Sequence, residues 1–208
     1  MNRKQQKIFD SILALIAKEG WTAQAWQQGV KASGLSMREA EKLFPGRIED
    51  IVAAFHQSID EAMHASIKAK RNFPALRTRD KITFAVRARL QAIENHREVM
   101  RRLLMWSILP QHIRGATKSL WDAADQIWVV AGDTSRDYNY YTKRLLLIAV
   151  MKSTLSFWLQ DGSADYRETW AFLDRRIADV MTMGKGLSVI KTVGVSDIVS
   201  FVRSRFAA

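Results

Sequence analysis

The chain has 208 residues and a formal net charge of +11 at pH 7, and 48% of its residues are hydrophobic. That apolar content excludes a disordered chain, and the lack of cysteine excludes disulfide bonds and thiolate metal sites. No uncharged apolar run reaches the roughly 20 residues that a membrane-spanning helix needs, so we expect a soluble or peripheral protein.

The sequence predicts an all-α fold, because apolar residues recur at spacings of three and four and alternating strand-like runs are missing. A first helix is expected over residues 3–18 and a second from residue 22 through residue 31. A third is predicted over residues 37–43, where Ser36 and Glu39 have the spacing of a capping box. Three short helices followed by a long one resemble the helix-turn-helix head of the TetR repressors.

This predicted head occupies residues 1–47. Its candidate recognition segment, residues 36–44, contains two basic and two acidic residues and therefore has no net charge. Phosphate contacts normally supply much of the affinity for DNA. The sequence therefore argues against DNA binding and favours a head that serves as a scaffold.

The positive charge is concentrated in residues 61–120, which hold thirteen basic and four acidic residues. A basic block of this kind suits phosphate, an anionic lipid or an acidic protein. The alternative is a solvated helical face without a partner.

A larger helical domain is predicted over residues 48–180. Its helices carry stripes that mix Trp and Met with aliphatic residues. Such stripes are either ordinary core or the lining of a pocket for a flexible hydrocarbon, since Met adapts its shape and Trp provides flat walls.

The sequence lacks a nucleophile elbow, a P-loop and a dinucleotide-binding glycine pattern. Glu61 and His64 have the spacing of a di-iron ligand pair, but a second pair is missing. We therefore predict a protein that is not an enzyme and that uses neither metal nor cofactor. Several carboxylates are interpreted as helix caps and ion-pair partners of Lys143, Arg144, Arg175 and Arg176: Asp133, Asp137, Asp161, Asp165 and Asp174.

The C-terminal part is predicted as a hinge over residues 181–186 and an amphipathic helix over residues 187–208. Apolar residues gather on one side of this helix: Leu187, Ile190, Ile198, Phe201 and Val202. Lys191 and Arg205 lie within the apolar sector, where long side chains reach towards headgroups, and Arg203 lies on the polar side. The segment either lies on a membrane surface or docks on the protein's own body or a twin subunit.

One tract resembles a known family in several spaced motifs. The motifs are AGD at 131–133, DYNYYTKR at 137–144, ST at 153–154, LQDGS at 159–163 and TWAFLDRRI at 169–177. They are similar to the signature of the ninth Coq protein family, the lipid-binding accessory factors of ubiquinone biosynthesis. A spaced match over roughly 50 residues is far more specific than a short motif.

The resemblance implies a TetR-like fold without a DNA role, an isoprenoid lipid held between helices, and a C-terminal helix that contacts the membrane. The lipid-binding candidates are Trp106, Trp128, Leu147, Met151, Leu155, Trp158 and Phe172. The family's demethoxyubiquinone hydroxylase would be contacted by Asp137, Tyr138, Tyr140 and Tyr141. Mitochondrial members place Trp where this chain has Tyr140, so the contact is expected to differ.

We therefore expect a homodimeric accessory protein that presents a quinone precursor from the membrane to a hydroxylase. The lack of a presequence favours a bacterial protein at the cytoplasmic face of the inner membrane. The alternative is a ligand-responsive transcription regulator of the TetR type, which would share the fold and an apolar pocket.

Overall fold

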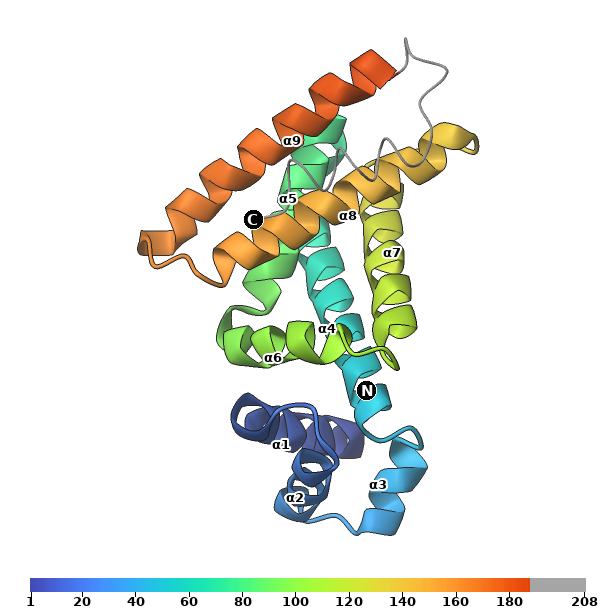
Figure 1. Cartoon of the computed structure of the whole chain (residues 1–208), viewed down its shortest axis with the longest axis vertical. Coiled ribbons are helices and arrows are strands. Elements are labelled where there is room, and N and C mark those ends of the chain that lie inside the picture. The colour runs from blue at the N-terminus through green and yellow to red at the C-terminus, as the bar shows by residue number, and fades with distance from the viewer. Residues whose placement is uncertain (188–208) are drawn as a thin grey trace. The chain divides into compact units, whose positions relative to one another are not determined.

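The computed structural model describes residues 1–187, with side chains through residue 182. Within this range nine α-helices and three short 3-10 helices follow one another without a strand, so the predicted all-α class is confirmed (Figure 1). The α-helices are α1 (Arg3–Glu19), α2 (Ala23–Ser33), α3 (Met37–Leu43), α4 (Ile48–Ala69), α5 (Thr78–Ala92), α6 (Arg97–Ser107), α7 (Ile113–Val130), α8 (Tyr138–Trp158) and α9 (Arg167–Leu187). The 3-10 helices are η1 (Phe73–Ala75), η2 (Glu94–His96) and η3 (Ala164–Tyr166).

Capping residues set the ends of the first helices. The side chain of Asn2 accepts a hydrogen bond from the backbone N–H of Gln5 at 2.9 Å, and Ser36 accepts one from Glu39 at 3.3 Å. The side chains of Gln5 and Glu39 in turn accept hydrogen bonds from the two cap N–H groups. Gly34 ends α2 with φ at 71°, a conformation that glycine adopts without a steric penalty. The predicted helix at 37–43 and its capping box are confirmed.

The first of two compact units consists of Met1–Ala62 and Ala92–Thr117. Trp21 Nε1 donates a hydrogen bond to the carbonyl oxygen of Val99 at 3.3 Å, and Arg102 Nε donates one to that of Ala17 at 3.1 Å. These bonds tie α6 to the end of α1. The unit therefore extends beyond the boundary predicted at residue 47. Its buried residues include Ile8, Ile12, Ile16, Trp26, Val30, Ile51, Phe55 and Leu103.

Helices α1 and α2 approach each other closely at Gly29. A Cβ atom placed on Gly29 would lie 2.4 Å from Ile12 Cγ1 and 2.9 Å from Ile12 Cα. Both distances are shorter than van der Waals contact, so any side chain at position 29 would force the two helices apart. The hydrogen atom of this glycine is what permits the close packing.

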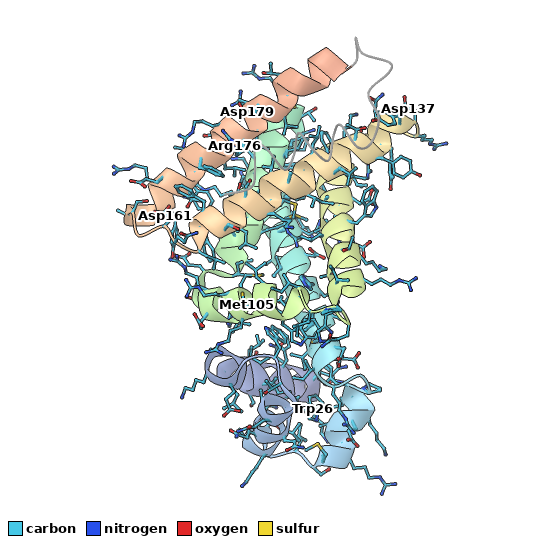
Figure 2. All side chains as sticks on the ribbon, in the orientation of Figure 1. Trp26, Met105, Asp137, Asp161, Arg176 and Asp179 are labelled. Carbon is cyan, nitrogen blue, oxygen red and sulfur yellow. The ribbon has the colours of Figure 1, made fainter. Side chains whose placement is uncertain are left out.

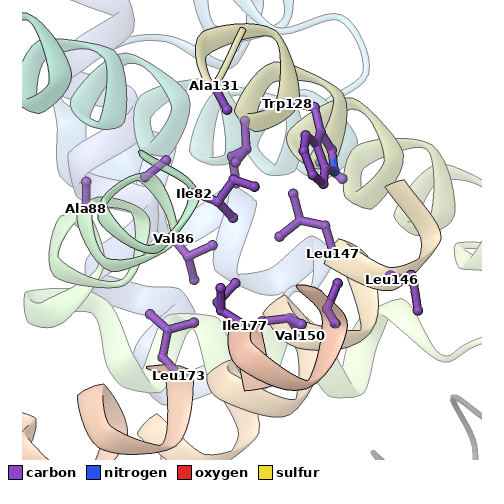
Figure 3. Packing of buried hydrophobic residues seen from close by; sticks show 14 of the residues in the cluster. Ile82, Val86, Ala88, Trp128, Ala131, Leu146, Leu147, Val150, Leu173 and Ile177 are labelled. Atoms are coloured by element: carbon purple, nitrogen blue, oxygen red, sulfur yellow. The ribbon is translucent and has the colours of Figure 1, made fainter. Parts of the chain in front are cut away.

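The second unit consists of Met63–Gln91 and Lys118–Ala208, and its described part is built around one apolar core (Figure 3). Helices α8 and α9 pack along each other in opposite directions (Figure 1). The core contains Ile82 and Val86 from α5, Ile127 and Trp128 from α7, Leu147 and Val150 from α8, and Leu173 and Ile177 from α9.

Helix α9 continues to Leu187, so the predicted hinge at residues 181–186 is helical instead. The two glycines at positions 184 and 186 each disfavour a helix by about 1 kcal/mol, which does not end this 21-residue helix. The remaining candidates for membrane contact, and the side chain of Leu187, lie outside the described residues: Ile190, Lys191, Ile198, Phe201, Val202, Arg203 and Arg205.

Candidate functional site

Three aromatic side chains, those of Trp121, Tyr140 and Tyr141, gather where α8 begins and α7 passes it, and Tyr138 lies on the same first turn of α8. We call Trp121, Tyr138, Tyr140 and Tyr141 the aromatic patch. The rings of Tyr140 and Tyr141 meet edge-on with centroids 5.1 Å apart, and the Trp121 ring lies 6.1 Å from Tyr140 and 6.0 Å from Tyr141. Tyr138 is 48% exposed and Tyr141 is 58% exposed. The predicted docking residues therefore form an accessible surface.

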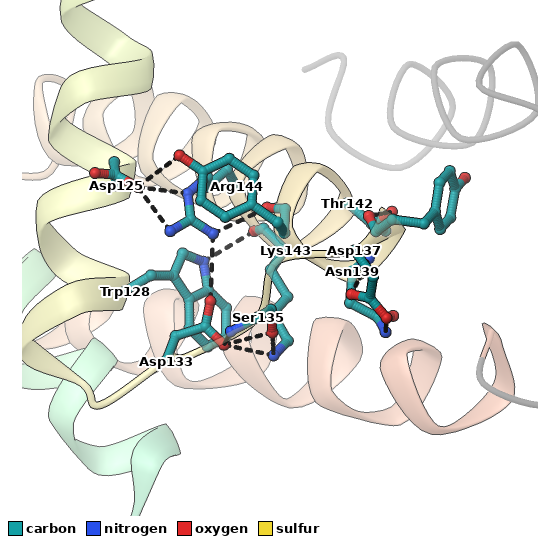
Figure 4. A network of polar contacts seen from close by, with 11 residues as sticks. Asp125, Trp128, Asp133, Ser135, Asp137, Asn139, Thr142, Lys143 and Arg144 are labelled. Carbon is teal, nitrogen blue, oxygen red and sulfur yellow. Dashed lines mark hydrogen bonds and ion pairs between the residues drawn. The ribbon is translucent and has the colours of Figure 1, made fainter.

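Asp137 fixes the start of α8. Its side chain accepts hydrogen bonds from the backbone N–H and the side-chain amide of Asn139, both at 3.0 Å. The Thr142 hydroxyl donates to the carbonyl oxygen of Tyr138 at 3.1 Å one turn later. Capping by Asp at this position stabilises a helix, and it holds the tyrosines at a defined place on the first turn (Figure 4).

Directly behind the aromatic patch lies a buried arginine, Arg144, whose side chain is only 3% exposed. Its Nε donates to Asp125 Oδ1 at 2.6 Å, and its Nη1 donates to Asp133 Oδ2 at 3.3 Å and to the carbonyl oxygen of Tyr140 at 3.0 Å. The guanidinium carbon lies 3.4 Å from the centroid of the Tyr140 ring. The Tyr140 hydroxyl donates to the same Asp125 oxygen at 3.1 Å (Figure 4).

Asp133 completes this network from the loop between α7 and α8. Burial raises the pKa of its carboxyl group, but hydrogen bonds from Lys143 at 2.7 Å, Ser135 at 2.7 Å and Arg144 outweigh that and lower the pKa. Asp133 is therefore ionised at neutral pH. The predicted pairing of Asp133 with Lys143 and Arg144 is confirmed.

The polar network joins the apolar core through Trp128. Its Nε1 donates to the carbonyl oxygen of Lys143 at 3.0 Å, and the Lys143 ammonium nitrogen lies 5.4 Å from the centroid of its ring. A substitution at Trp128 in the core would therefore also alter the contacts of Lys143, which belongs to the network behind the aromatic patch.

The seven lipid-binding candidates do not form one group. Trp106 belongs to the first unit, where its ring stacks on His112 at 3.5 Å. The other six belong to the second unit, in which Trp128, Leu147 and Trp158 are buried. Three candidates are only partly buried: Met151, Leu155 and Phe172. The buried candidates act as core, and the partly buried ones are the accessible part of the predicted wall.

Phe172 belongs to a second aromatic contact between α8 and α9. Its ring stacks on Phe157 with centroids 4.7 Å apart and an angle of 11°. The guanidinium group of Arg176 lies 5.3 Å from the Phe172 ring and pairs with Asp179 at 2.9 Å. Figure 2 shows Arg176 and Asp179 on α9.

Asp161 secures the turn between α8 and α9. It accepts hydrogen bonds from the backbone N–H of Ser163 at 2.7 Å and from the backbone and hydroxyl of Thr169. Burial raises the pKa of Asp161, but these bonds outweigh it and hold the pKa far below its ordinary value. Its predicted role as a cap is confirmed, as is that of Asp137.

Trp121 and Asp125 belong to the site but were not predicted from the sequence. Both lie on α7, four residues apart and so on one face of the helix. The spacing was readable in the sequence, but nothing in the sequence shows which face of α7 meets α8.

Two basic residues of the head form ion pairs with acids of α3. Lys4 pairs with Glu39 at 3.0 Å and Arg47 pairs with Glu41 at 2.8 Å. The hydrogen bond from Lys4, with that from Ser36, lowers the pKa of Glu39 to about 2. Within the described residues no three His, Asp or Glu side chains cluster so that they could hold a metal ion, and no described helix is long and apolar enough to cross a membrane.

Known proteins resemble this chain over most of its length. The profile of the COQ9 family matches residues 113–184. The chain is 30% identical over 196 residues to "Ubiquinone biosynthesis protein COQ9, mitochondrial" of Rattus norvegicus, and the match covers 91% of this chain and 62% of the rat protein. "Ubiquinone biosynthesis protein COQ9-B, mitochondrial" of Xenopus laevis is also 30% identical, and 67% of it is covered.

A solved structure supports the fold. The TetR transcriptional regulator from Nitrosomonas europaea superposes with a TM-score of 0.72, covering 86% of this chain and 99% of that protein, at 20% sequence identity. The predicted TetR-like fold is confirmed. At this identity the likeness concerns the fold alone.

Proposed function

The chain belongs to the COQ9 family, and from this premise we propose that it is an accessory protein of ubiquinone biosynthesis that presents an isoprenoid quinone precursor to a hydroxylase. The relatives that it matches carry ubiquinone biosynthesis in their names, and the chain spans 62% of the length of the rat protein. A polyprenyl tail is nearly insoluble in water, so an enzyme that modifies the ring benefits when another protein buries the tail.

The observation that carries this proposal is the aromatic patch. Tyrosine and tryptophan are enriched among the residues that dominate protein interfaces. Tyr138 and Tyr141 are exposed, whereas Tyr140 is held from behind by Arg144 and Asp125. A surface that is accessible and rigid loses little conformational entropy on binding. We assign the docking of demethoxyubiquinone hydroxylase to this patch.

Co-purification with the hydroxylase tests the docking surface. The double change Tyr140→Ala and Tyr141→Ala should abolish co-purification, because it removes two adjacent rings from the patch. The matched control is Val129→Ala, since Val129 is 59% exposed on α7 and lies outside the patch. A folded double variant that still binds the hydroxylase would contradict the proposal.

For the lipid, we propose that the tail lies against the partly buried wall of α8 and α9. Met151 and Leu155 are four residues apart and share one face of α8, and Phe172 lies on α9. Met adapts to a flexible chain. Trp128, Leu147 and Trp158 form the buried layer behind, and Trp106 stays a prediction.

Mass spectrometry of lipids that co-purify with the chain tests this wall. Isoprenoid quinone intermediates should be found with the natural sequence and be strongly depleted when Met151 and Leu155 are both changed to Gln. The control is Lys152→Gln, because Lys152 is exposed on the same turns of α8. Recovery of other lipids only, or equal recovery from the double variant, would refute the assignment.

Membrane contact through residues 187–208 and a homodimer are part of the same proposal. Flotation with liposomes should be weaker for a chain that ends at Met183 than for the full chain; equal flotation would overturn the membrane role. Sedimentation equilibrium measures the oligomeric state, and a monomer would overturn the dimer.

A further inference from the structure

An exposed apolar cluster lies in the first unit. It consists of Met105, Ile108, Leu109 and Ile113, which are 65%, 65%, 42% and 56% exposed. Nine large hydrophobic residues are this exposed within the described part of the chain, and these four fall in one stretch of nine positions. Scattered exposed apolar residues are normal, but a cluster marks an interaction surface.

The four residues lie on an ordered turn. Helical backbone extends to Ile108, so Met105 and Ile108 have the three-residue spacing of one helix face. The backbone N–H of Leu109 donates to the carbonyl oxygen of Trp106 at 3.3 Å. The backbone N–H of Ile113 then donates to the carbonyl oxygen of Leu109 at 3.1 Å, which brings Ile113 back beside it. Figure 2 shows Met105 on α6.

The turn is also held from behind. Trp106 stacks on His112 at 3.5 Å and its ring lies 6.4 Å from that of Trp21. The backbone N–H of His112 donates to the carbonyl oxygen of Leu109 at 2.9 Å. The aromatic side chain of this stretch is thus directed to the unit's own body, while the aliphatic ones remain exposed.

Basic residues outnumber acidic ones in the sequence around this cluster. Residues 99–121 contain Arg101, Arg102, Arg114 and Lys118 and no acidic residue. Arg114 is exposed, and the side chain of Arg101 is 52% exposed. Two acids flank this stretch: Glu98, which pairs with Arg101 and Arg102, and Asp122, which pairs with Lys118.

We propose that this cluster, residues 105–113 with its arginines, is a membrane-contact site for anionic phospholipid surfaces. Apolar side chains enter the boundary between headgroups and acyl chains, and neighbouring cations attract the anionic headgroups. The absence of acids within residues 99–121 removes the repulsion that a negative surface would exert. The site is distinct from residues 187–208 and from the aromatic patch, and it goes beyond the proposed function.

Flotation of the full chain with vesicles tests the site. The vesicles are phosphatidylcholine alone or phosphatidylcholine with phosphatidylglycerol. The natural chain should bind the anionic vesicles more strongly. The double change Ile108→Ser and Ile113→Ser should weaken that binding roughly tenfold or more, because two aliphatic side chains no longer leave water. Val129→Ser, at a residue 59% exposed on α7, is the matched control and should bind as the natural chain does.

Two substitutions distinguish the effect of charge near the cluster from the effect of the chain's net charge. Gln111 and Gln91 are both exposed, and changing either to Glu lowers the net charge by one. Gln111→Glu should weaken binding to anionic vesicles, whereas Gln91→Glu should leave it nearly unchanged.

Three results would overturn the proposal. One is equal vesicle binding by the Ile108 and Ile113 double variant, with its fold verified by circular dichroism. Another is equal binding to neutral and anionic vesicles. The third is a change in oligomeric state without a change in vesicle binding, which would assign the cluster to a second copy of the chain. Hydroxylase co-purification should be unaffected by these variants, so a failure here is distinguishable from a failure of the proposed function.

Discussion

At the scale of single residues, the buried guanidinium of Arg144 connects the interior of the second unit to its surface. It touches the Tyr140 ring on one side and two carboxylates on the other. Removing one partner of a buried ion pair lowers stability more than replacing both partners with apolar residues, because the remaining charge stays buried without its partner.

We therefore expect Arg144→Met to lower the free energy of unfolding by about 3–5 kcal/mol. The change leaves Asp133, whose side chain is 4% exposed, with Lys143 as its remaining cation in the network. Urea denaturation measures the loss. Lys143→Met is the comparison, since Lys143 is 37% exposed and should cost less. A loss below about 1 kcal/mol for Arg144→Met would show that the network relaxes around the gap.

The hydroxyl of Tyr140 anchors this ring. It donates to Asp125 at 3.1 Å, a bond that links the aromatic patch to the network. Tyr140→Phe should cost about 1 kcal/mol of stability while keeping the ring and most hydroxylase binding. Thermal unfolding and co-purification, measured together, check both halves. Loss of binding with unchanged stability would show that the hydroxyl contacts the hydroxylase directly.

Asp161 makes the free energy of unfolding depend on pH in the acidic range. Because the folded state holds its pKa below the ordinary value of 3.8, its contribution is present above that value and is lost as the pH falls below it. Asp161→Asn should reduce stability at pH 7 by about 1 kcal/mol and make the decline below about pH 4 shallower. Urea titrations across that range measure it. An unchanged decline would assign the acid sensitivity to other carboxylates.

At the scale of elements, the sequence was most informative where helices begin and end. Helix caps depend only on neighbouring residues, so they can be predicted from the sequence. The structure has an N-cap at Ser36 and at Asp137 and a C-cap at Gly34. The break predicted at residue 181 was wrong, because glycines weaken a helix without stopping it when no other signal follows.

Helix α8 shows the limit of such reading. It carries apolar residues on every side, which predicted more than one buried face but not which face meets which neighbour. The pairing of Arg144 with Asp125 depends on how α7 lies beside α8, and the spacing along either helix does not contain that distance. The same ambiguity applies to Trp128 and Leu147, which are predicted lipid contacts and lie in the buried core cluster.

At the scale of the whole molecule, the chain has a TetR-like fold, but its head does not have the positive charge that DNA binding needs. Lys4 and Arg47 form ion pairs with acids of α3, so part of the head's positive charge is neutralised within it. In a gel-shift assay with the gene's own upstream DNA we expect no complex at physiological salt. A complex whose affinity falls steeply with added salt would restore the regulator alternative.

The division of the chain into its two units could not be predicted from the sequence either. A boundary at residue 47 followed from the end of the third short helix, yet residues 92–117 return to the first unit. This return depends on contacts between segments about 80 residues apart, such as Trp21 with Val99, and no local pattern encodes them.

The close approach at Gly29 offers a genetic handle on the first unit. Alanine there would press on Ile12 in the first unit, whereas the aromatic patch and the α8 wall belong to the second unit. We expect Gly29→Ala to give a temperature-sensitive allele: a strain that makes ubiquinone in the cold and stops when warmed. Quinone content measured after a temperature shift would then time how quickly a cell exhausts its quinone supply once this protein unfolds.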